Sequence, residues 1–304
     1  MRLSAAIAVT LFLTANNLSA FAENQLTLHF SNPPLGLDWS SPQALTYSTL
    51  INALVDKIRG LDIPIGHVIE DLECGTYHRL MGMSPDGSAE ERTAILEGYG
   101  LGTMMNKYHG HLDTTEDATK VIQSMSKHGR NNFIRFQISQ STCGRLQDYI
   151  KEYEKRGLDK TYSGLNSCPL YEEGSGCSAF GASFLEVAGL LTPEFQTAWM
   201  RHLIVPYEYV GGPRTNKKVN VLKLLFSFDS HWASDPKDGV KLDFYDPELM
   251  NLWVKKALVD VHAFTSRAFP WDPQIATLEN SEGIAFDART VPTPTGDFFR
   301  KRNQ

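Results

Sequence analysis

The sequence predicts an α+β fold, because helical and strand-like segments mix along the chain without strict alternation. Helices are indicated at Ser41-Pro42 and Asp246-Pro247, where an N-cap residue precedes a proline at the first helical position. A strand is indicated at Phe133–Ile138, where apolar and polar residues alternate. A parallel α/β sheet would require regular alternation of strands and helices, which the sequence lacks.

The first 22 residues predict a secretory signal peptide. Arg2 supplies one positive charge, an apolar run follows from Leu3 to Leu13, and Ala20-Phe21-Ala22 has the Ala-x-Ala form of a cleavage site. We therefore expect cleavage after Ala22 and a periplasmic or secreted product. The run is also the only strongly apolar stretch, so no transmembrane helix is expected in the mature chain.

The mature chain, residues 23–304, has the length of one large domain or two small ones. Gly211-Gly212-Pro213 is the clearest internal break. It divides the chain into residues 23–210 and a C-terminal α+β extension, residues 211–304, which is either separate or part of the same domain. The net charge is −6 and no basic patch is apparent, which disfavours nucleic acid as a partner.

The N-terminal half is expected to contain a β-hairpin among several helices. The hairpin comprises a strand over 63–74, a turn at Gly75 and a return strand over 76–83. A helix precedes it from Pro42 to Gly60. The other expected segments are a strand at Leu26–Phe30, a loop over 84–88, a Gly- and His-rich stretch over 99–113, a helix from Thr114 to Gly129, a strand at Phe133–Ile138 and a helix at Cys143–Arg156.

The C-terminal half is expected to contain three more helices and two strands. The helices run from Cys177 to Gly189, from Thr192 through Trp199 and Leu203, and from Asp246 to about Phe264. The strands lie at Val219–Phe228 and Val240–Tyr245. The tail from Pro270, which is rich in Pro, Asp and Gly, is expected to be irregular.

The most distinctive stretch places a cysteine at the start of an apolar helix. Gly174-Ser175-Gly176 precedes Cys177, and Phe180, Phe184 and other apolar residues follow at helical spacing. Unpaired N–H groups and the helix dipole favour a negative charge in the first turn. A thiol there has a lowered pKa and is a better nucleophile. The alternative is a buried or disulfide-bonded cysteine.

The chain has four cysteines, Cys74, Cys143, Cys168 and Cys177. In an exported protein they allow two disulfides in any of three pairings. They equally allow one disulfide, one reactive thiol and one spare cysteine. The spacing does not decide between these arrangements.

A nucleophilic cysteine needs a base, and His67 is the best candidate. It follows a glycine on an otherwise apolar predicted strand, although a lone histidine is often structural. A third polar group should orient the imidazole. His78 lies on the predicted return strand and is the first choice, with an exposed structural role as its alternative. Glu70 and Glu73, on the strand of His67, are rivals.

These motifs resemble the circularly permuted papain-like fold, which includes permuted relatives of the NlpC/P60 peptidases and the lecithin:retinol acyltransferase-like proteins. Those families place a histidine on a strand, a second polar residue on the next strand and a cysteine at the start of a later helix. Here Gly66-His67-Val68 is similar to the histidine motif and Gly176-Cys177-Ser178-Ala179-Phe180 to the cysteine motif. The resemblance covers about residues 60–190, and the interval between His78 and Cys177 is longer than compact members need.

The resemblance implies a papain-like catalytic unit over 23–210 with helical insertions, in which a central helix carrying the cysteine packs on a small antiparallel sheet. It implies acyl transfer through a Cys177 thioester, with His67 as general base, His78 as orienter and no cofactor. The reaction would be hydrolysis or acyl exchange on a cell-wall peptide or a lipid acyl group. The backbone N–H of Cys177 would help to bind the oxyanion.

Two other functions remain open on the sequence. One is a non-catalytic exported binding or structural protein with two disulfides, in which Cys177 pairs with Cys168. The other is a zinc-dependent hydrolase that uses His109, His111 and Asp113, because alternating residues on one strand face can share a metal ion. The His109–Asp113 pattern is short and is also that of a polar loop before a capped helix.

Overall fold

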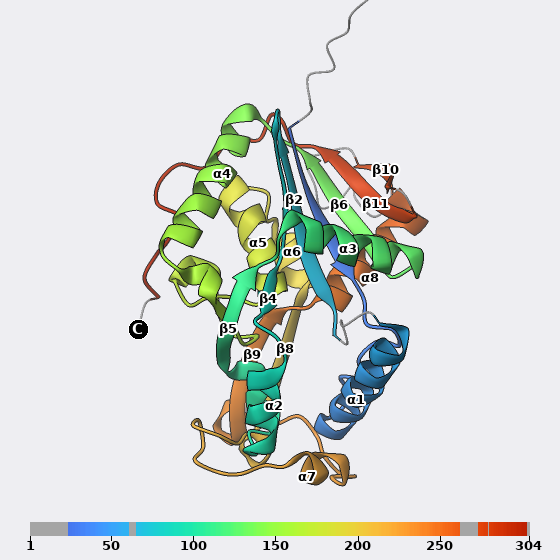
Figure 1. Ribbon diagram of the computed structural model, residues 1–304, viewed down its shortest axis with the longest axis vertical. Coiled ribbons are helices and arrows are strands. Elements are labelled where there is room, and N and C mark those ends of the chain that lie inside the picture. The colour runs from blue at the N-terminus through green and yellow to red at the C-terminus, as the bar shows by residue number, and fades with distance from the viewer. Residues whose placement is uncertain (1–23, 61–64, 262–272, 279, 303–304) are drawn as a thin grey trace, which may run out of the picture.

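A six-stranded sheet forms the centre of the molecule in the computed structural model, which describes residues 24–60, 65–261, 273–278 and 280–302 (Figure 1). The strand order is β10-β11-β6-β1-β2-β3, and all neighbours are antiparallel except β6 and β11. Its strands are β1 (Gln25–Ser31), β2 (His67–Cys74), β3 (Tyr77–Met81), β6 (Asn131–Gln137), β10 (Pro273–Leu278) and β11 (Ser281–Asp287). The protein is therefore a mixed α+β structure, as predicted.

Helices cover both faces of this sheet. The inward side chains of β1, β2 and β6, such as Leu28, Val68 and Phe136, join the main core, which also holds apolar residues of α4, α5 and α8. On the opposite face, Ile69 packs with Ala118 of α3. The bounds of these helices are α3 (Thr115–Lys127), α4 (Gln140–Lys155), α5 (Cys177–Ala188) and α8 (Pro247–Val259). No helix in the described ranges is long and apolar enough to cross a bilayer.

Two smaller sheets extend the structure beyond the central sheet. The first has the order β4-β5-β7, with β4 (Met83–Pro85), β5 (Lys107–Leu112) and β7 (Thr161–Ser163). The second pairs β8 (Met200–Pro206) with β9 (Gly239–Tyr245) and carries a second core around Tyr209, Leu224 and Leu242. The remaining helices are α1 (Pro42–Arg59), α2 (Ala89–Leu96), α6 (Pro193–Ala198) and α7 (Val221–Leu225). Short 3-10 turns lie at Leu101–Met105, Leu158–Lys160, Pro169–Tyr171, Tyr207–Tyr209 and Pro236–Asp238.

Most helices begin where the capping residues in the sequence predicted. The Ser41 hydroxyl accepts a hydrogen bond from the Ala44 N–H at the start of α1, and Thr114 serves α3 in the same way. Gly60 ends α1 with φ of 67°, a left-handed conformation that glycine adopts at little cost. The helix expected to begin at Cys143 instead begins at Gln140, because Ser139 is its N-cap.

Three other expectations for secondary structure were wrong, and the elements α2 and β5 were not predicted. The helix through Trp199 and Leu203 ends at Ala198, and the following residues form β8 because they pair with the distant β9. The strand expected at Val219–Phe228 is the short helix α7, which Asn220 caps. The irregular tail instead supplies β10 and β11. The Gly- and His-rich stretch contains β5, and α2 precedes it. These elements depend on contacts far along the chain, which local patterns do not encode.

Some expectations fall on residues that the structure does not describe. They are the signal peptide at 1–22, the first residues of the strand expected over 63–74, and the end of the helix expected to reach about Phe264. The division expected at residue 211 separates β8 from its partner β9, and it separates β6 from its parallel neighbour β11. Strands on both sides of this boundary therefore share sheets.

Candidate active site

Cys177 is the first residue of α5, which packs against β2 (Figure 1). Gly176 is the extended N-cap residue, and all of the helix except Ala179 and Glu186 is buried. The Cys177 side chain is free of any disulfide and is itself buried. The sequence prediction of a central helix that begins at this cysteine is therefore matched by the geometry.

His67 is the first residue of β2, and its imidazole interacts with both Cys177 and Asp113. Its Nε2 lies 3.6 Å from Oδ2 of Asp113, and the two side chains are only 13% and 10% exposed. The His67 ring is also near enough to the Cys177 sulfur for each group to shift the pKa of the other. Three chemically complementary groups thus meet in a nearly closed space.

The electrostatics of this group favour an ion pair between sulfur and imidazole. Burial alone would lower the pKa of His67, but the charge of Cys177 and the polar contacts with Asp113 and Cys177 raise that pKa to about 10. Burial would likewise raise the pKa of Cys177, but the charge and polar contact of His67, together with the backbone N–H groups of Val68 and Ser178, bring it below its usual value. Both shifts are in the direction that favours a thiolate beside an imidazolium.

Asp113 reaches His67 because the chain crosses from the large sheet to a small one at Gly82. β3 ends at Met81, β4 begins at Met83, and the backbone N–H of Asp113 donates to the Gly82 carbonyl at 2.9 Å. A Cβ at Gly82 would lie 2.9 Å from Oδ2 of Asp113 and 3.1 Å from Nε2 of His67. Glycine is therefore the residue that lets the carboxylate and the imidazole approach each other here.

Sequence reasoning missed Asp113 as a partner of His67 and named it only as a zinc ligand. The signal that could have placed it is the alternation of exposed and buried residues in β5, directly before Asp113. That alternation defines a strand whose last residue leads into the site. Its pairing with β4, however, is a tertiary contact.

His78, the residue expected to orient His67, lies elsewhere. It faces Glu73 across the β2–β3 hairpin, six residues along β2 from His67, which is roughly 20 Å for an extended strand. Its Nε2 is 2.9 Å from Oδ1 of Asp71, and its side chain is half exposed. The assignment of His78 as orienter is therefore wrong in position, and Glu73 lies with His78 rather than with Cys177.

Glu70 is the rival that does lie close to the site. It is fully buried beneath α5, and neither of its carboxyl oxygens has a hydrogen-bond partner. Burial, and secondly the charge of Cys177, raise its pKa well above the usual range, so we expect a neutral acid. Its Oε1 would lie 2.7 Å from a Cβ at Gly181, so α5 approaches β2 closely because that residue is glycine.

The histidines of the zinc hypothesis point to separate partners. His109 is paired with Glu90 through Nδ1, and His111 is paired with Asp86 at 2.7 Å. Nε2 of His111 also lies 3.6 Å from Oδ1 of Asp113, so Asp113 stands between two imidazoles. In the described part of the chain, the group of three potential ligands that does converge is Asp71, Glu73 and His78 on the hairpin. The metal site expected at His109, His111 and Asp113 is therefore not supported by the geometry.

The cysteines are paired differently from the non-catalytic hypothesis. Cys74, at the end of β2, forms a disulfide with Cys143 of α4. Cys168 and Cys177 are both free. The expected pairing of Cys177 with Cys168 is therefore wrong, and the thiol at the start of α5 remains available for chemistry.

Comparison with known proteins finds no relative for this chain: no protein-family model, no curated protein and no solved structure matches it. The site must therefore be interpreted from its own geometry.

A groove of about 480 Å³ lies beside α5, and neither Cys177 nor His67 lines it. Small residues of that helix, Ala179, Ala182 and Ser183, form part of its wall, and Tyr245 of β9 forms another part. The free thiol of Cys168 also lines it.

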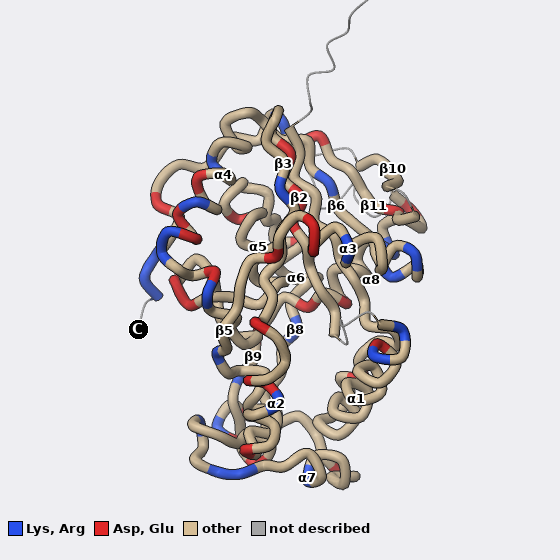
Figure 2. Tube along the Cα trace, in the orientation of Figure 1, with Lys and Arg blue, Asp and Glu red and all other residues tan. Residues whose placement is uncertain are grey.

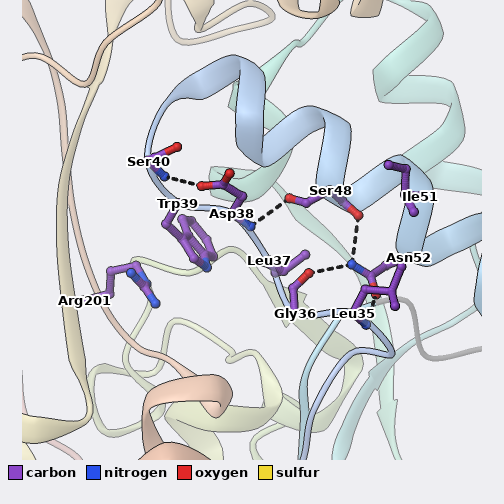
Figure 3. Close-up of a pocket in the computed structure, with 10 residues that line it drawn as sticks. All are labelled: Leu35, Gly36, Leu37, Asp38, Trp39, Ser40, Ser48, Ile51, Asn52 and Arg201. Carbon is purple, nitrogen blue, oxygen red and sulfur yellow. Dashed lines mark hydrogen bonds between the residues drawn. The ribbon is translucent and has the colours of Figure 1, made fainter.

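A second hollow of about 590 Å³ lies between the loop over 35–40 and α1 (Figure 3). Trp39 and Arg201 form one side of it, and the Arg201 guanidinium lies 4.7 Å from the centre of a Trp39 ring. Neither Cys177 nor His67 lines this hollow. We therefore separate it from the cysteine site.

Proposed function

We propose that this protein is an exported cysteine hydrolase or acyltransferase in which Cys177 is the nucleophile and His67 the general base. The observation that carries the proposal is the contact of a buried thiol at a helix N-terminus with an imidazole that also faces a carboxylate. We assign Asp113, in place of His78, as the group that orients the imidazole. The order His67, Asp113, Cys177 is also compatible with a permuted papain-like layout.

The proposed reaction begins from the ion pair. The Cys177 thiolate attacks the carbonyl carbon of an amide or ester, and the imidazolium of His67 gives its proton to the departing amine or alcohol. The result is a thioester on Cys177. A water molecule or a second acceptor then attacks the thioester while neutral His67 takes its proton, and the thiolate leaves.

Each neighbouring group has a part in this scheme. Asp113 faces Nε2 of His67, and its carboxylate would stabilise the imidazolium. The backbone N–H of Cys177, in the first turn of α5, is positioned to bind the oxyanion of the tetrahedral intermediate. Buried Glu70 remains neutral, so it adds no second negative charge beside the thiolate.

We place the peptide or acyl-bearing substrate of the cell envelope beside α5, where a groove shares this helix with Cys177 but is not lined by it. Its wall combines small and aromatic side chains with the charged groups of Lys241 and Asp243. Such a surface accepts an extended chain that carries both apolar and polar groups. Hydrolysis and acyl exchange proceed through the same thioester. The reaction is hydrolysis when water attacks the thioester and acyl exchange when another nucleophile does.

Iodoacetamide labelling tests the nucleophile. Cys177 should react faster than Cys168 at pH 7, because the ion pair maintains its thiolate whereas burial raises the pKa of Cys168. The labelling rate should fall only when the pH drops through the lowered pKa of Cys177. Above pH 10 His67 loses its proton and the pair loses its attraction. Peptide mass spectrometry at a series of pH values measures both rates.

Two variants complete this test. His67→Ala should raise the pKa of the Cys177 thiol and so slow its labelling at neutral pH, by up to about tenfold for each unit of the rise. It should leave Cys168 labelling unchanged, which serves as the internal control for folding. Cys177→Ser should abolish thioester formation with an activated ester. Equal reactivity of the two thiols, indifferent to His67→Ala, would contradict the proposal.

A further inference from the structure

From residue 50 onward, helix α1 has its most buried positions polar and its most exposed positions largely apolar, although Leu45 in its first half is buried. Asn52 and Asp56 are almost fully buried, whereas Leu54 is 61% and Ile58 76% exposed. A surface helix of a soluble protein ordinarily has the opposite arrangement. The packing of α1 on the rest of the protein therefore does not explain why these apolar side chains are exposed.

Specific hydrogen bonds hold the polar side in place. The Asn52 side chain donates to the Gly36 carbonyl and accepts from the Leu35 N–H, and the Ser48 hydroxyl accepts from the Asp38 N–H (Figure 3). Asp56 forms an ion pair with Arg130, and both side chains are buried. Buried polar groups with these partners are costly to expose. The orientation of α1 is therefore fixed, and its apolar side cannot turn inward.

Helix α7 and the residues after it extend the apolar side of α1. A shallow groove of about 350 Å³ lies between the two segments. Phe226 is 67% and Phe228 76% exposed, and the two rings contact each other edge to face. We call the exposed set the α1–α7 surface; it consists of Tyr47, Leu50, Leu54, Ile58, Phe226 and Phe228. Contiguous exposed apolar surface of this kind marks an interaction site.

Basic residues accompany this surface in a chain of net charge −6. Residues 208–229 contain four basic residues, Arg214, Lys217, Lys218 and Lys223, and two acidic residues, Glu208 and Asp229, at the two ends of the segment. In α1 the only acidic residue is Asp56, which is buried with Arg130, whereas Lys57 is exposed beside the apolar side. Figure 2 shows the basic positions on the loop that precedes α7 and at one end of α1. Local charge is therefore positive where the exposed apolar residues are.

We infer that the α1–α7 surface binds the face of an anionic lipid bilayer. Apolar and aromatic side chains would enter the interface between headgroups and acyl chains, and the lysines would meet the phosphates. Exposed Leu, Ile and Phe that lie mostly among basic residues, with Asp229 as the acidic neighbour of Phe228, fit an anionic lipid surface better than a neutral apolar partner. The inference does not depend on the cysteine chemistry, because lipid binding is measured without any activity.

Vesicle co-sedimentation tests the inference. The probe is the exported protein as isolated, with its first residue read by mass spectrometry so that all variants share one N-terminus. We expect it to sediment with phosphatidylcholine vesicles that contain phosphatidylglycerol, more weakly with phosphatidylcholine alone, and less as salt increases. The double variant Leu54→Ser with Phe228→Ser should partition at least about tenfold more weakly, because two buried apolar side chains are lost.

A matched control uses an equally exposed apolar residue outside the surface. Val259 of α8 is 87% exposed, so Val259→Ser should partition like the wild type. Charge reversal with Lys217→Glu and Lys218→Glu should remove most of the preference for anionic vesicles. Equal partitioning of the double variant and the wild type, or no partitioning of the wild type, overturns the inference. A dimer that the double variant dissociates, without vesicle binding, also overturns it and assigns this surface to a second copy of the chain.

Discussion

At the scale of single residues, the neighbours of His67 decide how the site is interpreted. His67 and Cys177 were identifiable as candidates because each stands at the start of a strongly patterned element. The orienting group was not, because Asp113 reaches the imidazole through a strand pairing across Gly82. His78, which is nearer in sequence, lies at the far end of the hairpin with Asp71.

A pair of variants separates these two assignments. Asp113→Asn removes the negative charge that favours the His67 imidazolium, so the apparent pKa of the Cys177 thiol should rise by about one unit, or about 1.4 kcal/mol. The pH profile of iodoacetamide labelling measures this shift. His78→Ala is the matched control and should leave the profile unchanged, since its ring contacts Asp71. A shift in the control variant alone would restore His78 as the orienter.

At the scale of elements, the close approach of α5 to β2 holds the cysteine over the histidine strand. A Cβ at Gly181 would lie 2.7 Å from Oε1 of Glu70 and 2.8 Å from Cγ1 of Val68. Gly144, in α4, faces open space, because a Cβ added there would have no neighbouring atom within 4 Å. The two helical glycines therefore differ in tertiary surroundings alone.

The substitutions Gly181→Ala and Gly144→Ala should change the free energy of unfolding in opposite directions. Gly181→Ala should destabilise the protein by about 1–3 kcal/mol through overpacking and should also slow Cys177 labelling, because α5 must move away from β2. Gly144→Ala should stabilise it by up to about 1 kcal/mol, since alanine has the better helix propensity. Urea unfolding measures both. If both substitutions destabilised the protein by a similar amount, the close approach of Gly181 to β2 would not explain the effect.

At the scale of the whole molecule, one disulfide joins the central sheet to the helical layer. Cys74 at the end of β2 and Cys143 in α4 are separated by 69 residues. A covalent link across a loop of that length restricts the unfolded chain considerably. It also holds α4 and β2 together, and both elements pack against α5.

Removal of this disulfide should weaken the fold without touching the reactive thiol. We expect Cys74→Ser with Cys143→Ser to lower the free energy of unfolding by about 2–5 kcal/mol. Cys168→Ser is the control and should leave it unchanged, because Cys168 is not in a disulfide. Denatured, unreduced protein should titrate two free thiols. Zero free thiols would mean that Cys168 and Cys177 are also oxidised.

The sequence alone determined those features that depend on neighbouring residues. Caps at Ser41, Thr114 and Asp246 fixed helix starts, because an N-cap side chain bonds a backbone N–H three residues or fewer away. Apolar spacing after Cys177 fixed the central helix in the same local way. The hairpin of β2 and β3 followed from a turn between two strand-like runs.

Only the tertiary structure decided the partners of these elements. It paired Cys74 with Cys143, brought Asp113 to His67 and placed β11 beside β6. Each of these contacts joins residues tens of positions apart or more. Their free energy comes from excluding water and satisfying polar groups between surfaces that exist only after folding, so no local pattern records them.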